Sequence, residues 1–133
     1  MSVKSFIIGG TQYNAAMASA VDQDKLMSLL SAGLIERALT CAAAGSDLDD
    51  GVLVPMFMSM PQQAKSIAAS ILAARVVLNG TDRSVTAADF GGKMVQYNQL
   101  LAELLRWNLS DFFEWLLVAH AGEKANKGAV PAQ

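Results

Sequence analysis

The sequence has few of the residues from which catalytic and metal sites are usually built. It contains one cysteine, one histidine and three prolines in 133 residues. The single cysteine, Cys41, excludes an internal disulfide bond, and no set of metal-ligating residues is spaced around it. Neither Cys41 nor His120 stands in a catalytic motif. We expect Cys41 to be a small residue of the core and His120 to be a cation near the C-terminal end of a helix. The sequence predicts no catalytic residue, no metal site and no cofactor, and we do not expect an enzyme.

Charged residues are also scarce. They make up 17% of the chain, against about 25% in an average soluble domain. Lys and Arg number 10 and Asp and Glu number 12, so the formal net charge is -2 and no excess of basic residues can neutralise a nucleic-acid backbone. We therefore expect no nucleic-acid partner. In contrast, 53% of the residues are hydrophobic, more than a domain of this size buries alone, which favours a homo-oligomer or another protein partner.

Long hydrophobic runs are absent. Charged residues interrupt each apolar segment before it reaches the about 20 residues that a membrane-spanning helix needs. The N-terminal segment has an apolar stretch of only Phe6, Ile7 and Ile8, which is too short for a secretory signal. We expect no membrane partner, and the single cysteine fits a reducing cytoplasm.

The first segment predicts a β-hairpin. Over residues 5–17, apolar and aromatic residues flank Gly9 and Gly10, which have the chemistry of a tight turn. An alanine-rich helix over residues 12–20 is the alternative.

The rest of the chain is predicted to be helical. Ser19 with Asp22 predicts a helix start and Gly45 a helix end, and between them one long helix and two short ones broken at Gly33 fit equally well. Apolar periodicity and capping residues predict four further helices. The first covers about 54–59, and the second covers 61–78 and is closed by Asn79 and Gly80. The third runs from 86 to about 106, is opened by Thr86 with Asp89 and is interrupted near Gly91 and Gly92, and the last is capped by Asn108 or Ser110 and ended by Gly122.

These elements predict a mainly α fold. We expect a small bundle of about four to six helices with a short N-terminal β-hairpin. Residues 1–121 form a single helical domain in this interpretation. Residues 122–133 gather Lys, Gly, Pro and Gln without periodicity and are predicted to be a disordered tail.

Two apolar segments are candidate surfaces for a partner or for self-association. The first packs three methionines and a phenylalanine into five residues, more than one helical face buries. The second, WNLSDFFEWLL, covers more than one face of a short helix with aromatic residues, which are frequent in interfaces and in cores alike. The candidate residues are Met56, Phe57, Met58, Met60, Trp107, Phe112, Phe113 and Trp115.

The chain resembles a known family in several short segments. These are FIIGGTQYNAA near the start, VTAADF at a predicted helix start and LLRWNLSDFFEWL near the end, separated by a helical middle. Together, over about residues 5–118, they resemble the tail assembly chaperones of long-tailed, non-contractile (siphovirus-type) bacteriophages.

The resemblance implies a viral protein that acts in the host cell cytoplasm during virion morphogenesis and is absent from the mature virion. Such a protein binds the tape measure protein, keeps it soluble and helps recruit tail tube subunits. The tail tube protein is contacted through a longer form made by ribosomal frameshifting, and the junction would fall within 122–133. The family has no catalytic residues to transfer to this sequence.

A small helical transcriptional regulator, or a protein antagonist of one, is the alternative. It would require a helix-turn-helix whose second helix presents Arg, Lys, Asn or Gln outward. The best candidate helix, 61–78, offers Lys65, Arg75 and two glutamines, without a convincing preceding turn.

Overall fold

The computed structural model describes residues 2–116 and 118. Its elements are β1 (Val3–Ile8), β2 (Thr11–Ala16), α1 (Ala20–Ala44), α2 (Asp50–Ser59), α3 (Gln62–Ala73), β3 (Val76–Leu78), a 3-10 helix η1 (Ala87–Phe90) and α4 (Met94–Asn108). Residues 110–116 continue as a further helix. The mainly helical fold with an N-terminal hairpin is confirmed.

The hairpin forms at the predicted glycines. Gly9 and Gly10 have φ angles of 57° and 82°, the positive values that the tightest hairpin turn requires of both central residues. Ile8 pairs with Thr11, and the antiparallel register continues to Val3 opposite Ala16. The alternative of an alanine-rich helix over 12–20 is wrong, because residues up to Ala16 are paired in the sheet.

A third strand replaces the end of the helix predicted over 61–78. The helix α3 ends at Ala73, and β3 pairs antiparallel with β2, with Val76 opposite Ala15. The β-branched residues Val76 and Val77 favour extended backbone, and β2 supplies hydrogen-bond partners on that side. Residues 79–80, predicted to close a helix, instead form a turn after the strand.

The helix α1 is continuous through Gly33. Its start is capped as predicted, because the Ser19 hydroxyl accepts a hydrogen bond from the Asp22 N–H at 3.2 Å. Its end is also as predicted, with Gly45 at φ 73° and its N–H directed to the last carbonyls of the helix. The single long helix, rather than two short ones, is the structure adopted.

The helix predicted from Thr86 to about Arg106 is divided into two. Thr86 and Asp89 form the predicted capping box, but they cap only the short helix η1. Gly92, at φ 75°, turns the chain before α4 begins at Met94, so the interruption predicted near Gly91 and Gly92 is a complete break.

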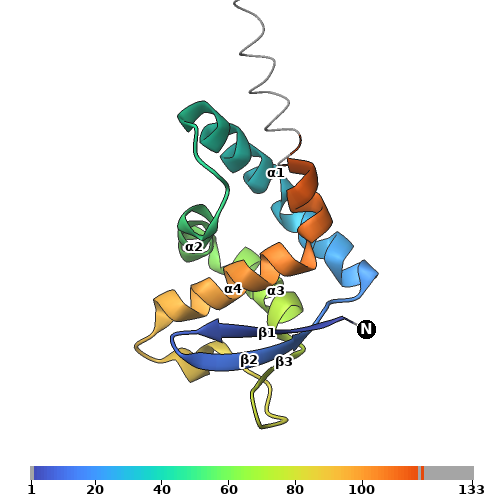
Figure 1. Ribbon diagram of the computed structural model, residues 1–133, viewed down its shortest axis with the longest axis vertical. Coiled ribbons are helices and arrows are strands. Elements are labelled where there is room, and N and C mark those ends of the chain that lie inside the picture. Colours follow the sequence, from blue (N-terminus) through green and yellow to red (C-terminus); the bar gives the residue numbers. More distant parts are fainter. Residues whose placement is uncertain (1, 117, 119–133) are drawn as a thin grey trace, which may run out of the picture.

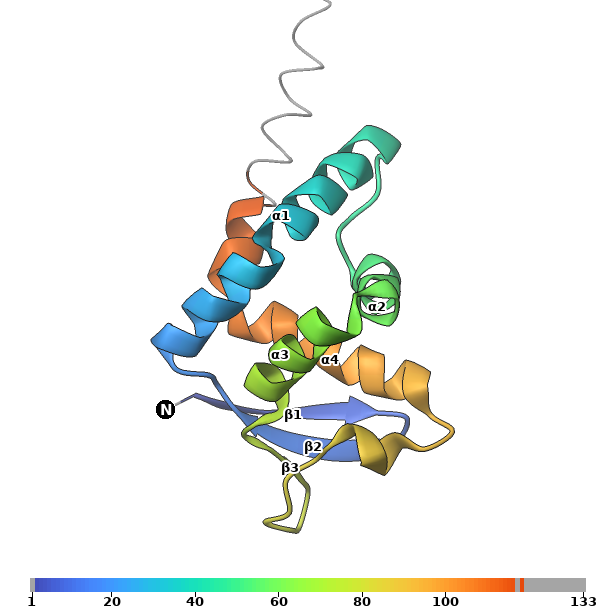
Figure 2. The ribbon, with the colours of Figure 1, turned by 180° about the vertical axis from the view of Figure 1, so that it is seen from behind.

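The core lies between the sheet and the helices. Figures 1 and 2 show α4 crossing one face of the sheet, with α2 and α3 beyond it and α1 extending away from the sheet. Aromatic contacts join the layers: the Phe6 and Trp107 rings lie 5.7 Å apart, and Phe90 lies between Tyr13 and Tyr97 at 5.8 and 5.3 Å. The helix 110–116 runs beside α1 in both views.

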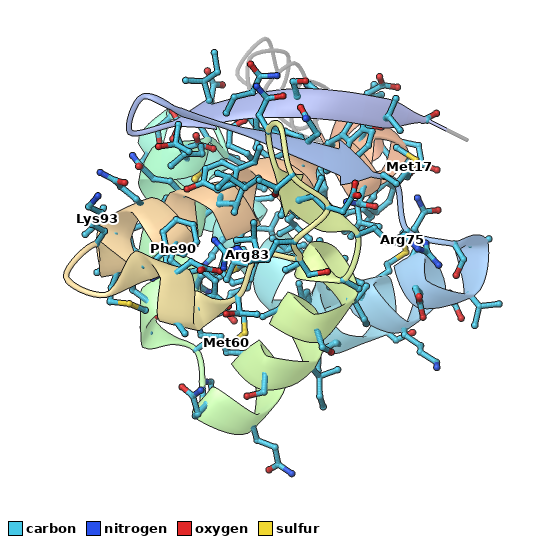
Figure 3. The ribbon with its side chains drawn as sticks, turned by 90° about the horizontal axis from the view of Figure 1, so that it is seen from below. Met17, Met60, Arg75, Arg83, Phe90 and Lys93 are labelled. Atoms are coloured by element: carbon cyan, nitrogen blue, oxygen red, sulfur yellow. The ribbon has the colours of Figure 1, made fainter. Side chains whose placement is uncertain are left out.

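The segment that joins the hairpin to α1 is held by two long-range hydrogen bonds. Arg75 donates to the Met17 carbonyl at 3.2 Å, and the two residues are labelled near each other in Figure 3. The Asn108 side chain accepts from the Ala18 N–H at 2.8 Å. Asn108 was predicted as one of two caps for the last helix, but it is the last residue of α4 and its side chain serves this tertiary contact.

Several predictions concern residues outside the described ranges. They are the helix end at Gly122, the environment of His120 and the disordered tail over 122–133. The domain boundary at residue 121 lies there as well.

Candidate protein-binding surface

Three of the eight candidate contact residues are core residues. Phe57 is 0% exposed and Met56 is 5% exposed, so half of the methionine segment closes the core between α2 and α4. Phe112 is also buried. The prediction that these three side chains form contact surface is corrected by their burial: a side chain enclosed by its own domain has no face left for a partner.

The other five candidates reach the surface. Met58 and Trp115 are more than half exposed, and Met60, Trp107 and Phe113 are half-buried against the core. Trp107 and Phe113 line one cleft together, and none of the methionines lines it. The aromatic segment therefore contributes to a cleft in which the methionine segment takes no part.

The cleft has a neighbour, and the two adjoin at Arg106 and Phe113. The cleft lined by Trp107 has a volume of about 320 Å³, and its neighbour has a volume of about 260 Å³. We call this pair the Phe113 groove. Its lining residues are Ala38, Asp47, Leu48, Asp49, Arg106, Phe113 and Leu116 on one side and Lys4, Glu103, Trp107, Ser110 and Glu114 on the other.

Local sequence explains how the groove forms. Leu109 lies between α4 and the helix 110–116 with φ −113° and ψ 36°, so the chain bends there. The bend lets Leu116 pack into the core while Phe113, farther round the helix, is left half-buried between the two clefts. Residues 45–49, which link α1 to α2, supply the acidic side of the groove.

The groove carries more negative than positive charge. Arg106 forms an ion pair with Asp50 at 3.2 Å. Within the part of the chain that the structure describes, Asp47 and Asp49 have no ion-pair partner, although Asp49 accepts a hydrogen bond from the Gly51 N–H at 3.0 Å. The pKa of Glu103 is raised, mainly by a hydrogen bond with Asp50 and secondly by partial burial. The groove therefore combines an apolar floor with an acidic rim.

An exposed apolar stripe on α1 extends this surface, and the sequence analysis missed it. Ile35 is 38% exposed and Leu39 54% exposed, and they stand about 60° and 100° around the helix from Ala38, which lines the groove. The exposed Ala32 and Ala43 lie on the same side. The sequence pattern gives little indication of this stripe, because apolar residues surround α1 on nearly all sides. Periodicity alone could therefore not identify which side of the helix is buried.

The composition of α1 allows a second interpretation. The helix is long and apolar enough to cross a membrane, with a mean hydropathy of 1.4 in its most apolar window, although 22% of that window is buried inside the domain. Leu26, Leu30 and Leu34 pack into the core, as they do in a helix of a folded domain. The expectation of no membrane partner stays a prediction.

Other polar groups of the described chain serve the fold. Lys65 donates to Asn98 at 2.6 Å and lies 5.8 Å from the centre of the Tyr97 ring, and partial burial lowers the pKa of its ammonium group. Arg75, counted among the cations of a candidate recognition helix, lies beyond the end of α3. Among residues 2–116 and 118, no three His, Cys, Asp or Glu side chains are grouped so as to hold a metal ion.

Comparisons with protein families, with curated proteins and with solved structures find no match to this chain.

Proposed function

We propose that this chain is a tail assembly chaperone of a long-tailed, non-contractile bacteriophage. In this role it binds amphipathic helices of the tape measure protein, keeps that protein soluble and helps recruit tail tube subunits during tail assembly. The proposal rests on the short segments that resemble this family and on one structural observation, the apolar surface formed by the Phe113 groove and the α1 stripe.

That surface suits a helical client. Amphipathic helices are bound in grooves that accept apolar side chains at three- and four-residue spacing. The groove offers Leu48 and Phe113 beside open space, and Ile35 and Leu39 continue the apolar surface outside it. Trp115 is 57% exposed but does not line the groove, and it is a separate candidate contact of the aromatic kind that anchors protein interfaces.

Charge specifies the client further. Because Arg106 is already paired with Asp50, the carboxylates of Asp47 and Asp49 are the charges that the rim offers to a partner. A client helix with Lys or Arg beside its apolar face complements this rim, and such pairs act mainly on the rate and specificity of association.

The proposal includes self-association and a place of action. Copies of the chain assemble along the extended tape measure protein in the host cell cytoplasm and leave before the virion is complete. A longer, frameshifted form contacts the tail tube protein. No catalytic step, nucleic acid or membrane takes part in this mechanism.

Co-expression tests the client interaction. The chain is produced together with the tape measure protein of its phage, and the fraction of tape measure protein in the soluble lysate is measured. Wild type is expected to raise this fraction, and Leu39→Asp or Ile35→Asp to lower it, since each places a charge at an exposed position of the proposed contact surface.

Met94→Asp is the matched control. Met94 is 48% exposed and begins α4, at the opposite end from the Phe113 groove. Circular dichroism verifies that all three variants are folded. If Met94→Asp reduces the solubility of the tape measure protein as much as the other two, or if none of them does, the proposed surface is wrong; if wild type gives no increase, the proposed function is wrong.

A further inference from the structure

The outer edge of β1 has unpaired backbone groups. The sheet order is β1-β2-β3, so β1 has a neighbour on one side only. The Met17 N–H donates to the Ser2 carbonyl at 3.0 Å, and the hairpin closes at Ile8 and Thr11. Because alternate residues of a strand direct their backbone groups to opposite sides, Lys4, Phe6 and Ile8 bond to β2.

The other residues of β1 therefore direct their backbone groups away from β2, towards the open edge of the sheet. Val3, Ser5 and Ile7 direct their N–H and C=O groups to the open side, and no described residue forms a hydrogen bond with them there. The other edge of the sheet differs, because Val85 donates to Val76 at 3.0 Å and Val77 bridges to Ser84. In Figure 3, β1 is the strand farthest from β3.

The side chains of β1 are also suited to pairing with another strand, because two apolar ones are largely exposed. Val3 is 73% exposed and Ile7 is 71% exposed. Natural edge strands are commonly protected by proline, by a bulge or by several charges. This one contains none of these apart from the charge of Lys4, and its register with β2 is regular throughout.

We infer that β1 pairs antiparallel with β1 of a second copy of this chain, about a two-fold axis at Ser5, to form a continuous six-stranded sheet. In this register Val3 lies opposite Ile7 of the second copy and Ser5 opposite Ser5. By symmetry, Ile7 also lies opposite Val3 of the second copy. The residues of all three pairs direct their backbone groups outward, so each pair exchanges two hydrogen bonds.

The charge of Lys4 selects this register and favours a second copy as the partner. With the axis at Ser5, Lys4 lies opposite Phe6, and a lysine over this ring is already tolerated within one chain, where Lys4 Nζ lies 5.2 Å from the Phe6 ring centre. Moving the axis to Lys4 would place two lysines directly opposite each other, which is destabilising. Moving it to Phe6 would leave Val3 opposite the turn instead of a strand. The edge is thus complementary to itself in one register.

This inference deepens the self-association part of the proposed function and rests on that part alone. It does not involve the Phe113 groove or the α1 stripe, so the client surface can fail while the β1 pairing stands, and the reverse.

Sedimentation equilibrium over a wide concentration range tests the pairing. Wild type is expected to show a concentration-dependent monomer–dimer equilibrium. Ser5→Pro removes the central N–H donors of the dimer and is tolerated in the monomer, because this N–H points away from β2. It is expected to weaken dimerisation at least about tenfold.

The matched control is Ser5→Ala. The Ser5 hydroxyl donates to Asn14 at 2.8 Å on the outer face of the sheet, and both substitutions remove this bond, but alanine keeps the backbone N–H. Its dimerisation constant is expected to stay within about twofold of wild type. Circular dichroism verifies that the hairpin is retained in both variants.

A charge pair tests the register. Ile7→Lys alone and Val3→Glu alone are expected to weaken the dimer, and the double variant to recover most of the loss, because each new carboxylate then faces a new ammonium group of the second copy. Within one chain these positions are four residues apart along an extended strand, too distant to interact.

Three results would overturn the inference: a strictly monomeric wild type, a dimer that Ser5→Pro and Ile7→Lys both leave intact, or a dimer lost in Leu39→Asp instead. The solubility of the tape measure protein, measured separately on the same variants, distinguishes a failure of this pairing from a failure of the proposed function.

Discussion

The side chain of Asn108 accepts a hydrogen bond from the backbone N–H of Ala18, ninety positions earlier in the chain. Asn108 is 5% exposed. Its amide nitrogen donates to the Leu104 carbonyl at 2.9 Å, and its own carbonyl accepts from Gln23 at 3.0 Å. One buried residue at the end of α4 therefore fixes both the linker after the hairpin and the first turn of α1.

Substituting Asn108 is expected to destabilise the fold substantially. Asn108→Leu leaves the partly buried Ala18 N–H without its acceptor, and the loss of a partner for a buried polar group costs about 1–3 kcal/mol. Urea unfolding followed by circular dichroism measures the loss. Gln23→Ala, which removes only the half-buried side-chain donor, is the control and is expected to cost less, about 0.5–1.5 kcal/mol. Equal losses in the two variants would contradict the role given to the Asn108 side chain.

The two turn glycines are expected to differ in their tolerance of alanine. Both have positive φ angles, so either substitution costs about 1–2 kcal/mol in backbone strain. A Cβ at Gly9 would in addition require the flexible end of the Gln96 side chain to move, a small further cost, whereas a Cβ at Gly10 meets no atom.

Gly9→Ala should therefore lower the free energy of unfolding slightly more than Gly10→Ala in denaturant titrations. The double variant Gly9→Ala with Gln96→Ala separates the displacement of the Gln96 side chain from the strain: it is expected to return to the level of Gly10→Ala, measured against Gln96→Ala alone. A Gly9→Ala variant no less stable than Gly10→Ala would show that the turn and α4 do not approach as described.

The methionine segment is expected to divide into core and surface positions. Phe57 is fully buried and Met58 is 54% exposed. Phe57→Ala should cost about 3–5 kcal/mol, the usual range for removing a buried aromatic side chain, whereas Met58→Ala should change stability by about 0.5 kcal/mol or less. Thermal melting of the two variants measures the difference. Similar effects at both positions would contradict the orientation of α2.

Local sequence patterns were sufficient to predict the turns and helix ends, which depend on neighbouring residues. Gly9 and Gly10 identified the hairpin, and Ser19 and Gly45 identified both ends of α1, because turns and caps depend on the residues that form them. They were not sufficient for β3. The run ending in Val76 and Val77 fits a buried helix and a buried strand equally well, and pairing with a strand some sixty residues earlier decided between them.

The candidate surface was predictable only in part, for a related reason. The sequence indicated that Trp107 to Trp115 contains more apolar residues than one face can bury, and the structure places Trp107 and Phe113 in the groove and Phe112 in the core. Which side of each helix faces inward depends on how the helices pack on one another and on the sheet, and this is long-range information. The acidic rim formed by Asp47 and Asp49 could not be predicted, since nothing local in the sequence places these residues beside Phe113.

The charge of Glu103 is expected to make stability depend on pH. A hydrogen bond with Asp50, with partial burial as a second cause, raises the pKa of Glu103 above its ordinary value, so the folded state holds this proton more tightly than the unfolded state does. This contribution favours folding at low pH and is lost as the pH rises through the folded-state pKa. At neutral pH the ionised Glu103 therefore opposes folding.

Glu103→Gln is accordingly expected to be more stable than wild type at pH 7, by less than about 1 kcal/mol because the site is partly exposed to solvent. The advantage should shrink as the pH falls below the folded-state pKa of Glu103, since the wild-type side chain is then protonated in the folded state while it is still ionised in the unfolded state. Thermal melting at several pH values between 4 and 8 measures this difference. Glu36→Gln, an exposed carboxylate on α1, controls for the change in net charge. A Glu103→Gln advantage that is independent of pH, or that Glu36→Gln reproduces, would show that the neighbouring Asp50 is not its source.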